Sequence, residues 1–189
     1  MNQFKHISNE HFDEESYREA QVVCFVYDSV SKCIDLVVIY VAEILSAYFQ
    51  HISEGNDPKS YNIPFYDFRL LRFSKLSDLT FTSNDEVLNQ NLPRTITPDQ
   101  WNELEKTIIG GSPRLITGIQ CRKKTKNYSM AVSIDSTGNF NWNYKSMDVL
   151  QKITKIERNF GDCIKYIDVD TNEEVDPKNP FEREILKRN

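Results

Sequence analysis

The sequence predicts an α+β fold, in which a long N-terminal helical region packs on an antiparallel sheet and further helices lie between the strands. Two patterns carry this prediction. Apolar residues recur at helical spacing across residues 22–49, and apolar and polar residues alternate on both arms of residues 130–144. The chain has 189 residues, a length typical of one domain, so residues 1–189 are expected to form a single core.

The predicted N-terminal helix rests on apolar side chains that recur every three or four residues across 22–49. Asp13 is a suitable N-cap for the chain that leads into it. The segment is rich in β-branched residues, so a hairpin of two buried strands, residues 22–27 and 36–41, is the alternative. The helix is favoured because the apolar stripe continues through residues 28–32, where a hairpin would have to turn. A helix with this many apolar residues is expected at the centre of the core, or at the interface of a homodimer formed through residues 22–49.

Shorter patterns predict the other elements. Aromatic and aliphatic residues indicate one or two strands in 65–82, and further strands at 115–121 and 163–169. Helices are predicted at 97–108 and at 146–160, because each begins with a capping residue and carries apolar residues at helical spacing. An acidic turn and a short helix led by Pro180 are expected to follow the last strand.

The segment 130–144 predicts a β-hairpin. Its first arm alternates Met130, Val132 and Ile134 with smaller or polar residues, and its second arm alternates aromatic residues with asparagines. Gly138 is placed to take the positive φ angle that closes a short turn. We expect Val132, Ile134, Phe140 and Trp142 on the buried face of this hairpin.

The same hairpin resembles one found in small bacterial immunity proteins, including the YezG-like family. In those proteins an apolar strand, the pattern Asp-x-x-Gly-x-Phe and an aromatic strand follow one another, and Asp135, Gly138 and Phe140 fill that pattern here. Residues 179–183 are similar to the end of those proteins. The resemblance implies a cytoplasmic protein that binds and blocks a partner toxin, and it carries over no functional residue.

Composition narrows the class of protein. Aromatic residues make up 12% of the chain and charged residues 27%, which is the balance of a folded globular chain. Acidic residues follow the first few positions where a signal peptide would be apolar, and charges interrupt the most apolar segment, so neither export nor a membrane span is expected. The four cysteines lie far apart and are interpreted as reduced thiols. These features predict a cytoplasmic protein.

Motifs of known chemistry are incomplete in this sequence. Asp168, Asp170 and Asn172 match the first ligand positions of a calcium-binding EF-hand loop, but Glu173 stands where that loop needs glycine. Ser29 and Lys32 have the spacing of a serine nucleophile and its lysine, without the partner motifs of that enzyme class. No metal, cofactor or catalytic residue is therefore assigned. An enzyme whose site is assembled from residues distant in sequence stays open as an alternative.

Two charged clusters are the candidate binding sites. Residues 1–94 carry 14 acidic and 8 basic side chains, and the predicted helix entrance holds four acids, which are Glu10, Asp13, Glu14 and Glu15. These acids are the expected contacts for a basic protein partner, and the protein is interpreted as a non-enzymatic inhibitor. The alternative is nucleic-acid binding through the basic cluster Arg122, Lys123, Lys124 and Lys126. In that alternative the aromatic arm of the hairpin would stack on bases.

Overall fold

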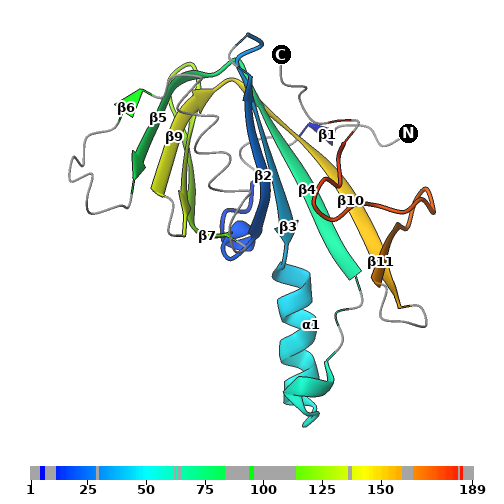
Figure 1. Cartoon of the computed structure of the whole chain (residues 1–189). Coiled ribbons are helices and arrows are strands. Elements are labelled where there is room, and N and C mark those ends of the chain that lie inside the picture. Colours follow the sequence, from blue (N-terminus) through cyan, green and yellow to red (C-terminus); the bar gives the residue numbers. More distant parts are fainter. Residues whose placement is uncertain are drawn as a thin grey trace.

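The fold is an antiparallel sheet that bends over on itself (Figure 1). The computed structural model describes residues 5–6, 12–28, 30–61, 63, 65–83, 94–95, 114–135, 138–158, 164–182 and 184. In these residues eleven strands form the sheet in the order β1-β10-β4-β3-β2-β7-β8-β9-β5-β6, with β11 paired to β10. The strands are β1 (Lys5–His6), β2 (Gln21–Asp28), β3 (Cys33–Tyr40), β4 (Phe65–Ser74), β5 (Ser77–Ser83), β6 (Arg94–Thr95), β7 (Arg114–Lys123), β8 (Tyr128–Ile134), β9 (Gly138–Tyr144), β10 (Ser146–Arg158) and β11 (Ile164–Asp168). The helical elements are α1 (Ala42–Ser53) and the 3₁₀ turns η2 (Glu15–Tyr17) and η3 (Pro58–Ser60).

The sheet has two halves that face each other across the core (Figure 1). Strands β1, β11, β10, β4, β3 and β2 form the first half, and β7, β8, β9, β5 and β6 form the second half. The chain crosses between the halves at two tight corners. Two residues, Lys75 and Leu76, separate β4 from β5, and Lys145 alone separates β9 from β10. Lys75 has a φ angle of 56°, in the left-handed region, so the backbone reverses direction sharply at the first corner.

Most of the core lies between the two halves. The residues that fill it are alternate side chains on the inner faces of the strands, as expected for packed sheets. They include Phe25, Ile34, Leu36, Leu71, Phe73, Met130, Val132, Phe140, Trp142 and Tyr144. A second, smaller cluster lies on the outer face of the first half and is made of Val37, Ile39, Phe68, Leu70, Leu150 and Phe181. The first half is therefore apolar on both faces.

The predicted helix over residues 22–49 is wrong. Residues 21–28 and 33–40 form the hairpin β2–β3, and helix begins only at Ala42. The chain turns where the predicted helix would continue. In this turn the Asp28 carboxylate accepts hydrogen bonds from the Val30 N–H at 2.9 Å and the Ser31 hydroxyl at 2.6 Å. Because β3 is buried on both faces, it lacks the polar alternation that marks a half-buried strand. The helix through which a homodimer was expected, residues 22–49, is therefore not formed.

The predicted helix over residues 146–160 is also wrong. Ser146–Arg158 is the long strand β10, which pairs with β4 from Ser146 opposite Ser74 to Lys155 opposite Phe65. Val149 enters the inter-sheet core, whereas Leu150 enters the outer cluster. Because adjacent residues of this strand are both buried, its apolar positions lack the alternation of a half-buried strand and fit the spacing of a helix. The predicted α+β fold is thus corrected to a largely β fold with one α-helix in the described residues.

Other predictions agree with the structure. The hairpin of β8 and β9 pairs Val132 with Phe140 and Met130 with Trp142. The four residues predicted on its buried face, which are Val132, Ile134, Phe140 and Trp142, are all buried. Gly138 has a φ angle of 145°, and a Cβ atom there would collide with the carbonyl oxygen of Thr82. Strands also occupy the predicted ranges near 65–82, 115–121 and 163–169. The helix predicted at 97–108 and most of the one led by Pro180 lie outside the described residues.

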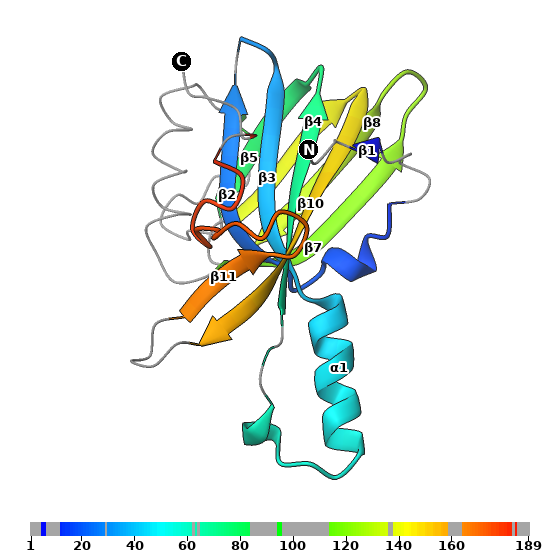
Figure 2. The same ribbon diagram turned by 90° about the vertical axis from the view of Figure 1, so that its right-hand side faces the viewer.

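Helix α1 extends beyond the end of β3, away from the body of the sheet (Figure 2). The Tyr61 ring packs against the Tyr48 and His51 rings of α1, with ring centroids 5.4 Å apart in both pairs. His51 also binds the carbonyl oxygen of Asp57 at 3.2 Å and the Ser60 hydroxyl at 3.0 Å. This histidine therefore holds the turn after the helix.

Candidate functional site

A C-terminal segment, residues 169–182 and 184, lies against the outer face of the first half, and we refer to it as the C-terminal strap. Phe181 anchors it, because its fully buried ring fills the outer apolar cluster. Two cations of the sheet hold its backbone. The Lys152 ammonium donates to the carbonyl oxygen of Pro180 at 2.6 Å, and the Arg72 guanidinium donates to that of Glu184 at 2.6 Å.

Arg72 is itself fixed by a buried carboxylate. Its Nε and Nη2 atoms donate to the two oxygens of Asp35 at 2.8 and 2.7 Å, and the Asp35 side chain is fully buried. The hydrogen bonds to Asp35 raise the pKa of Arg72, although burial opposes them. The cation therefore keeps its charge, and its remaining hydrogen-bonding capacity positions the strap.

The strap begins in a tight turn after β11. The Asp168 carboxylate, which is 2% exposed, accepts hydrogen bonds from the backbone N–H groups of Asp170 at 2.8 Å and Thr171 at 3.3 Å. The chain then returns beside β11, where the Val175 N–H donates to the carbonyl oxygen of Tyr166 at 2.8 Å. This turn is the segment that matches the start of an EF-hand loop, and its carboxylate caps the backbone.

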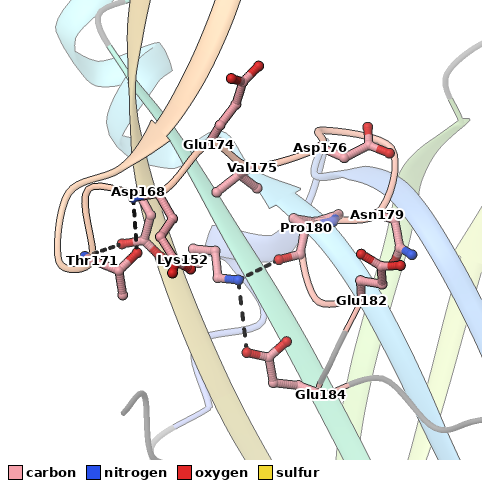
Figure 3. A pocket seen from close by; sticks show the side chains of 11 residues that line it. Lys152, Asp168, Thr171, Glu174, Val175, Asp176, Asn179, Pro180, Glu182 and Glu184 are labelled. Atoms are coloured by element: carbon pink, nitrogen blue, oxygen red, sulfur yellow. Dashed lines mark hydrogen bonds and ion pairs between the residues drawn. The ribbon is translucent and has the colours of Figure 1, made fainter.

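A pocket of about 470 Å³ lies between this turn, the strap and β10 (Figure 3). Its lining combines acidic side chains with apolar surface. The residues are Lys152, Asp168, Thr171, Glu173, Glu174, Val175, Asp176, Asn179, Pro180, Glu182 and Glu184. Six of these eleven residues are carboxylates, and Lys152 is the one cation among them. We refer to this site as the acidic pocket.

The cation in the acidic pocket is already engaged. Besides its bond to Pro180, the Lys152 ammonium lies 3.9 Å from Oε1 of Glu184 and 5.0 Å from the centre of the Phe181 ring. Figure 3 shows it reaching toward Pro180 and Glu184, while Glu174 and Asp176 lie on the other side of the pocket. Lys165 offsets one further charge through its 2.7 Å ion pair with Glu174. Among the described residues, the pocket therefore keeps an excess of negative charge.

The acidic pocket favours an extended cation. Among the described residues, no three His, Cys, Asp or Glu side chains come close enough together to hold a metal ion. The carboxylates are instead spread around the walls, beside Val175 and Pro180. A lysine or arginine side chain has this combination of an apolar stem and a charged end. The chemistry of the lining is thus complementary to a basic side chain.

Three of the four N-terminal acids predicted as partner contacts, Asp13, Glu14 and Glu15, have a local role in the structure. The Asp13 carboxylate accepts from both the N–H and the hydroxyl of Ser16, and Glu14 accepts from the Cys121 N–H. Glu15 forms an exposed ion pair with Arg18 at 3.2 Å. Glu10 lies outside the described residues. The three described acids surround the η2 turn, and Glu14 ties that turn to β7.

The predicted basic cluster is exposed at the end of β7 and in the turn that follows. Arg122, Lys123, Lys124 and Lys126 are all solvent-accessible. The aromatic residues proposed as a stacking platform are not available to bases, because Phe140, Trp142 and Tyr144 are at most 1% exposed. They point into the core, away from the outer face of the second half. The stacking form of the nucleic-acid alternative is therefore excluded.

Sequence reasoning did not identify the acidic pocket. A signal was present, because residues 168–176 contain five acids, and we predicted an acidic turn there. The pocket also needs Lys152 from a strand that was predicted as a helix, together with Glu182 and Glu184 from the strap. Only the fold brings these three segments together.

Comparison with models of protein families, with curated proteins and with solved structures gave no significant match. In the described part of the chain, no helix is both long and apolar enough to cross a membrane.

Proposed function

We propose that this protein is a non-enzymatic binding protein that acts in the cytoplasm by capturing a basic protein partner in the acidic pocket. The observation that carries the proposal is a pocket of about 470 Å³ with six carboxylates and one cation that is already engaged. A lysine or arginine of the partner would enter this pocket and pair with carboxylates for which the described part of the chain supplies no such cation. The resemblance of the 131–144 hairpin to immunity proteins would make the partner a toxin and the protein its inhibitor.

The physical basis is electrostatic. Glu173, Asp176 and Glu182 are exposed at the pocket, so their field extends into solvent. A field of one sign steers an oppositely charged partner and raises the association rate by about tenfold to a thousandfold at low salt. Dissociation depends more on the contacts made within the pocket. The proposal therefore expects association to be strongly dependent on ionic strength.

The experiment compares two sets of matched charge removals in affinity purification from the native host. One variant carries Glu173→Gln, Asp176→Asn and Glu182→Gln in the pocket. The other carries Glu10→Gln, Asp13→Asn and Glu15→Gln at the N-terminal acids. We expect one stoichiometric basic protein with the wild type and with the N-terminal variant, and its loss with the pocket variant. Mass spectrometry identifies and quantifies it.

Each other outcome has a defined meaning. Loss with the N-terminal variant alone would move the binding surface to the acids predicted from the sequence. Equal retention by all three proteins would overturn the acidic pocket as the contact. Once the partner is identified, its association rate is measured as a function of salt concentration. This measurement distinguishes electrostatic steering from short-range contacts. An association rate that is insensitive to ionic strength would contradict the electrostatic mechanism.

A further inference from the structure

The outer face of the second half carries a polar groove that the proposed function does not use. Residues that pair directly across neighbouring strands share a face of the sheet. Gln120 lies opposite Ala131, and Ala131 lies opposite Asn141. In the next row Arg122 lies opposite Ser129, and Ser129 opposite Asn143. This face is therefore polar across three strands, on the side opposite the buried Met130 and Trp142.

The lengths of the side chains explain why this face is hollow. Strand β8 contributes the short Ser129 and Ala131, whereas β7 and β9 on either side contribute the longer Gln120, Arg122, Asn141 and Asn143. Short residues between two rows of longer ones leave a depression along the central strand. The structure has a pocket of about 380 Å³ at this place, which we refer to as the β8 groove.

Hydrogen bonds fix one end of the β8 groove. The Lys124 ammonium donates to Oδ1 of Asn143 at 2.9 Å, and Nδ2 of Asn143 donates to Oδ2 of Asp78 at 2.6 Å. The Asn143 amide is thereby held in one orientation between a cation and an anion. The Ser77 hydroxyl also donates to Asp78 at 3.2 Å. Lys124 keeps further donor capacity, because an ammonium group has three N–H bonds.

The charge at this end is positive. Among the described lining residues, Arg122 and Lys124 are accompanied by a single acid, Asp78, whose Oδ2 already accepts from Asn143 and Ser77. Lys123 and Lys126 lie close by in the chain and are exposed. A guanidinium presents a planar pair of donors that matches the oxygens of a carboxylate or a phosphate. The side-chain amide N–H groups of Gln120 and Asn141 add neutral donors along the same groove.

We infer that the β8 groove is a binding site for an oxyanion, either a phosphate or a carboxylate group, with Arg122 as its principal donor. This site lies on the outer face of the second half, whereas the acidic pocket lies on the outer face of the first half. The two sites have opposite charge and use different residues. The inference therefore holds or fails independently of the proposed function.

The test is a titration followed by ¹⁵N-¹H correlation NMR at constant ionic strength. Inorganic phosphate and acetate are the two probes, and the side-chain amide signals of Gln120, Asn141 and Asn143 report on the groove. We expect saturable shifts of these signals with at least one probe. Arg122→Gln should weaken that binding by about tenfold or more, because a charge-assisted bidentate contact is lost. Lys126→Gln removes the same charge from the neighbouring turn and should change the affinity by less than about twofold.

The two probes also separate the sources of the anion. Saturation by phosphate alone would assign the site to phosphate groups, and saturation by acetate as well would extend it to carboxylates. Shifts that do not saturate, or an affinity that Arg122→Gln and Lys126→Gln weaken equally, would overturn the inference. Only a general attraction of anions to a basic surface would then remain. Single-stranded RNA provides a further check. If it binds both variants equally weakly, and phosphate binding does not saturate, the inference is also overturned.

Discussion

The guanidinium carbon of Arg69 lies 3.4 Å from the centre of the Tyr40 ring, in the space between the two halves of the sheet. Its Nε and Nη2 atoms donate to Oδ2 of Asp67 at 3.1 and 2.8 Å, and its Nη1 donates to the Tyr17 hydroxyl at 3.2 Å. Gln151 donates to the same Asp67 oxygen at 2.9 Å. Burial opposes the charged form of Arg69, but these hydrogen bonds outweigh it and raise the pKa of the guanidinium. Arg69 thus joins Asp67 to the buried rings of Tyr17 and Tyr40 in a polar network at the core.

Arg69→Met is expected to destabilise the protein by about 3 to 5 kcal/mol, because it leaves the buried Asp67 carboxylate without its cation. Combining it with Asp67→Leu should recover most of the loss, since the unpaired charge is then gone. Urea unfolding of the two variants measures this. Arg18→Gln, which breaks an exposed ion pair, is the control and should cost less than about 1 kcal/mol. If the double variant is as unstable as Arg69→Met alone, the network stabilises the fold through more than the ion pair of Arg69 with Asp67.

Trp142→Ala is expected to cost about 3 to 5 kcal/mol, because a large buried side chain is removed from the inter-sheet core. The indole ring is 1% exposed and lies 5.1 Å from the Phe73 ring and 6.0 Å from the Phe25 ring. Asn141→Ala changes the neighbouring residue on the outer face and should shift the unfolding midpoint little. Similar midpoints for the two variants would contradict the assignment of the faces of β9.

Phe181→Ala is expected to release the C-terminal strap while leaving the inter-sheet core folded. The ring fills the outer cluster, and its loss removes the main apolar contact of the strap. Limited proteolysis should then cut within residues 169–184 at protease concentrations that leave the wild type intact. Lys178→Ala, an exposed change on the strap, should keep the wild-type pattern. The acidic pocket should weaken with the strap, so partner binding should fall in Phe181→Ala as well.

Burial raises the pKa of Tyr144, with a further contribution from its contact with Cys121, and burial also raises the pKa of Tyr17. The folded protein keeps these protons at a pH where the unfolded chain, with tyrosines near 10.0, releases them. The stability that these groups contribute is therefore complete below pH 10 and is lost as the pH rises above it. We expect the free energy of unfolding to fall there by up to about 1.4 kcal/mol per pH unit for each tyrosine.

Urea unfolding between pH 8 and about pH 11.5 measures this decline, and tyrosinate absorbance gives the ionisation directly. Tyr144→Phe should flatten the decline above pH 10, because one of the raised groups is gone. Its stability at pH 8 provides the reference for the loss of the hydroxyl itself. A slope above pH 10 that is the same in the variant and the wild type would show that Tyr144 does not contribute.

The sequence predicted the hairpin of β8 and β9, in which one face is buried and the other is more exposed. In β8 and β9 the buried Val132 and Phe140 alternate with polar neighbours, so the period of two is visible. In β3 and β10 both faces pack against other parts of the chain, and adjacent residues such as Val149 and Leu150 are both apolar. Periodicity then cannot distinguish a strand from a helix. The acidic pocket was missed for a related reason, since it needs Lys152 from β10, a strand that was predicted as a helix.

The corners at 75–76 and at 145 also bear on how the chain folds. The first half of the sheet is not a continuous stretch of sequence, because the whole second half, β5 to β9, lies between β4 and β10 in the chain. Strand β2 must find β7, and β1 must find β10, which lie far along the chain. Loop closure over such separations precedes the contacts that reward it, so folding is expected to be slow for a domain of this length. Once formed, the two halves share a backbone at both corners and should unfold together in one cooperative transition.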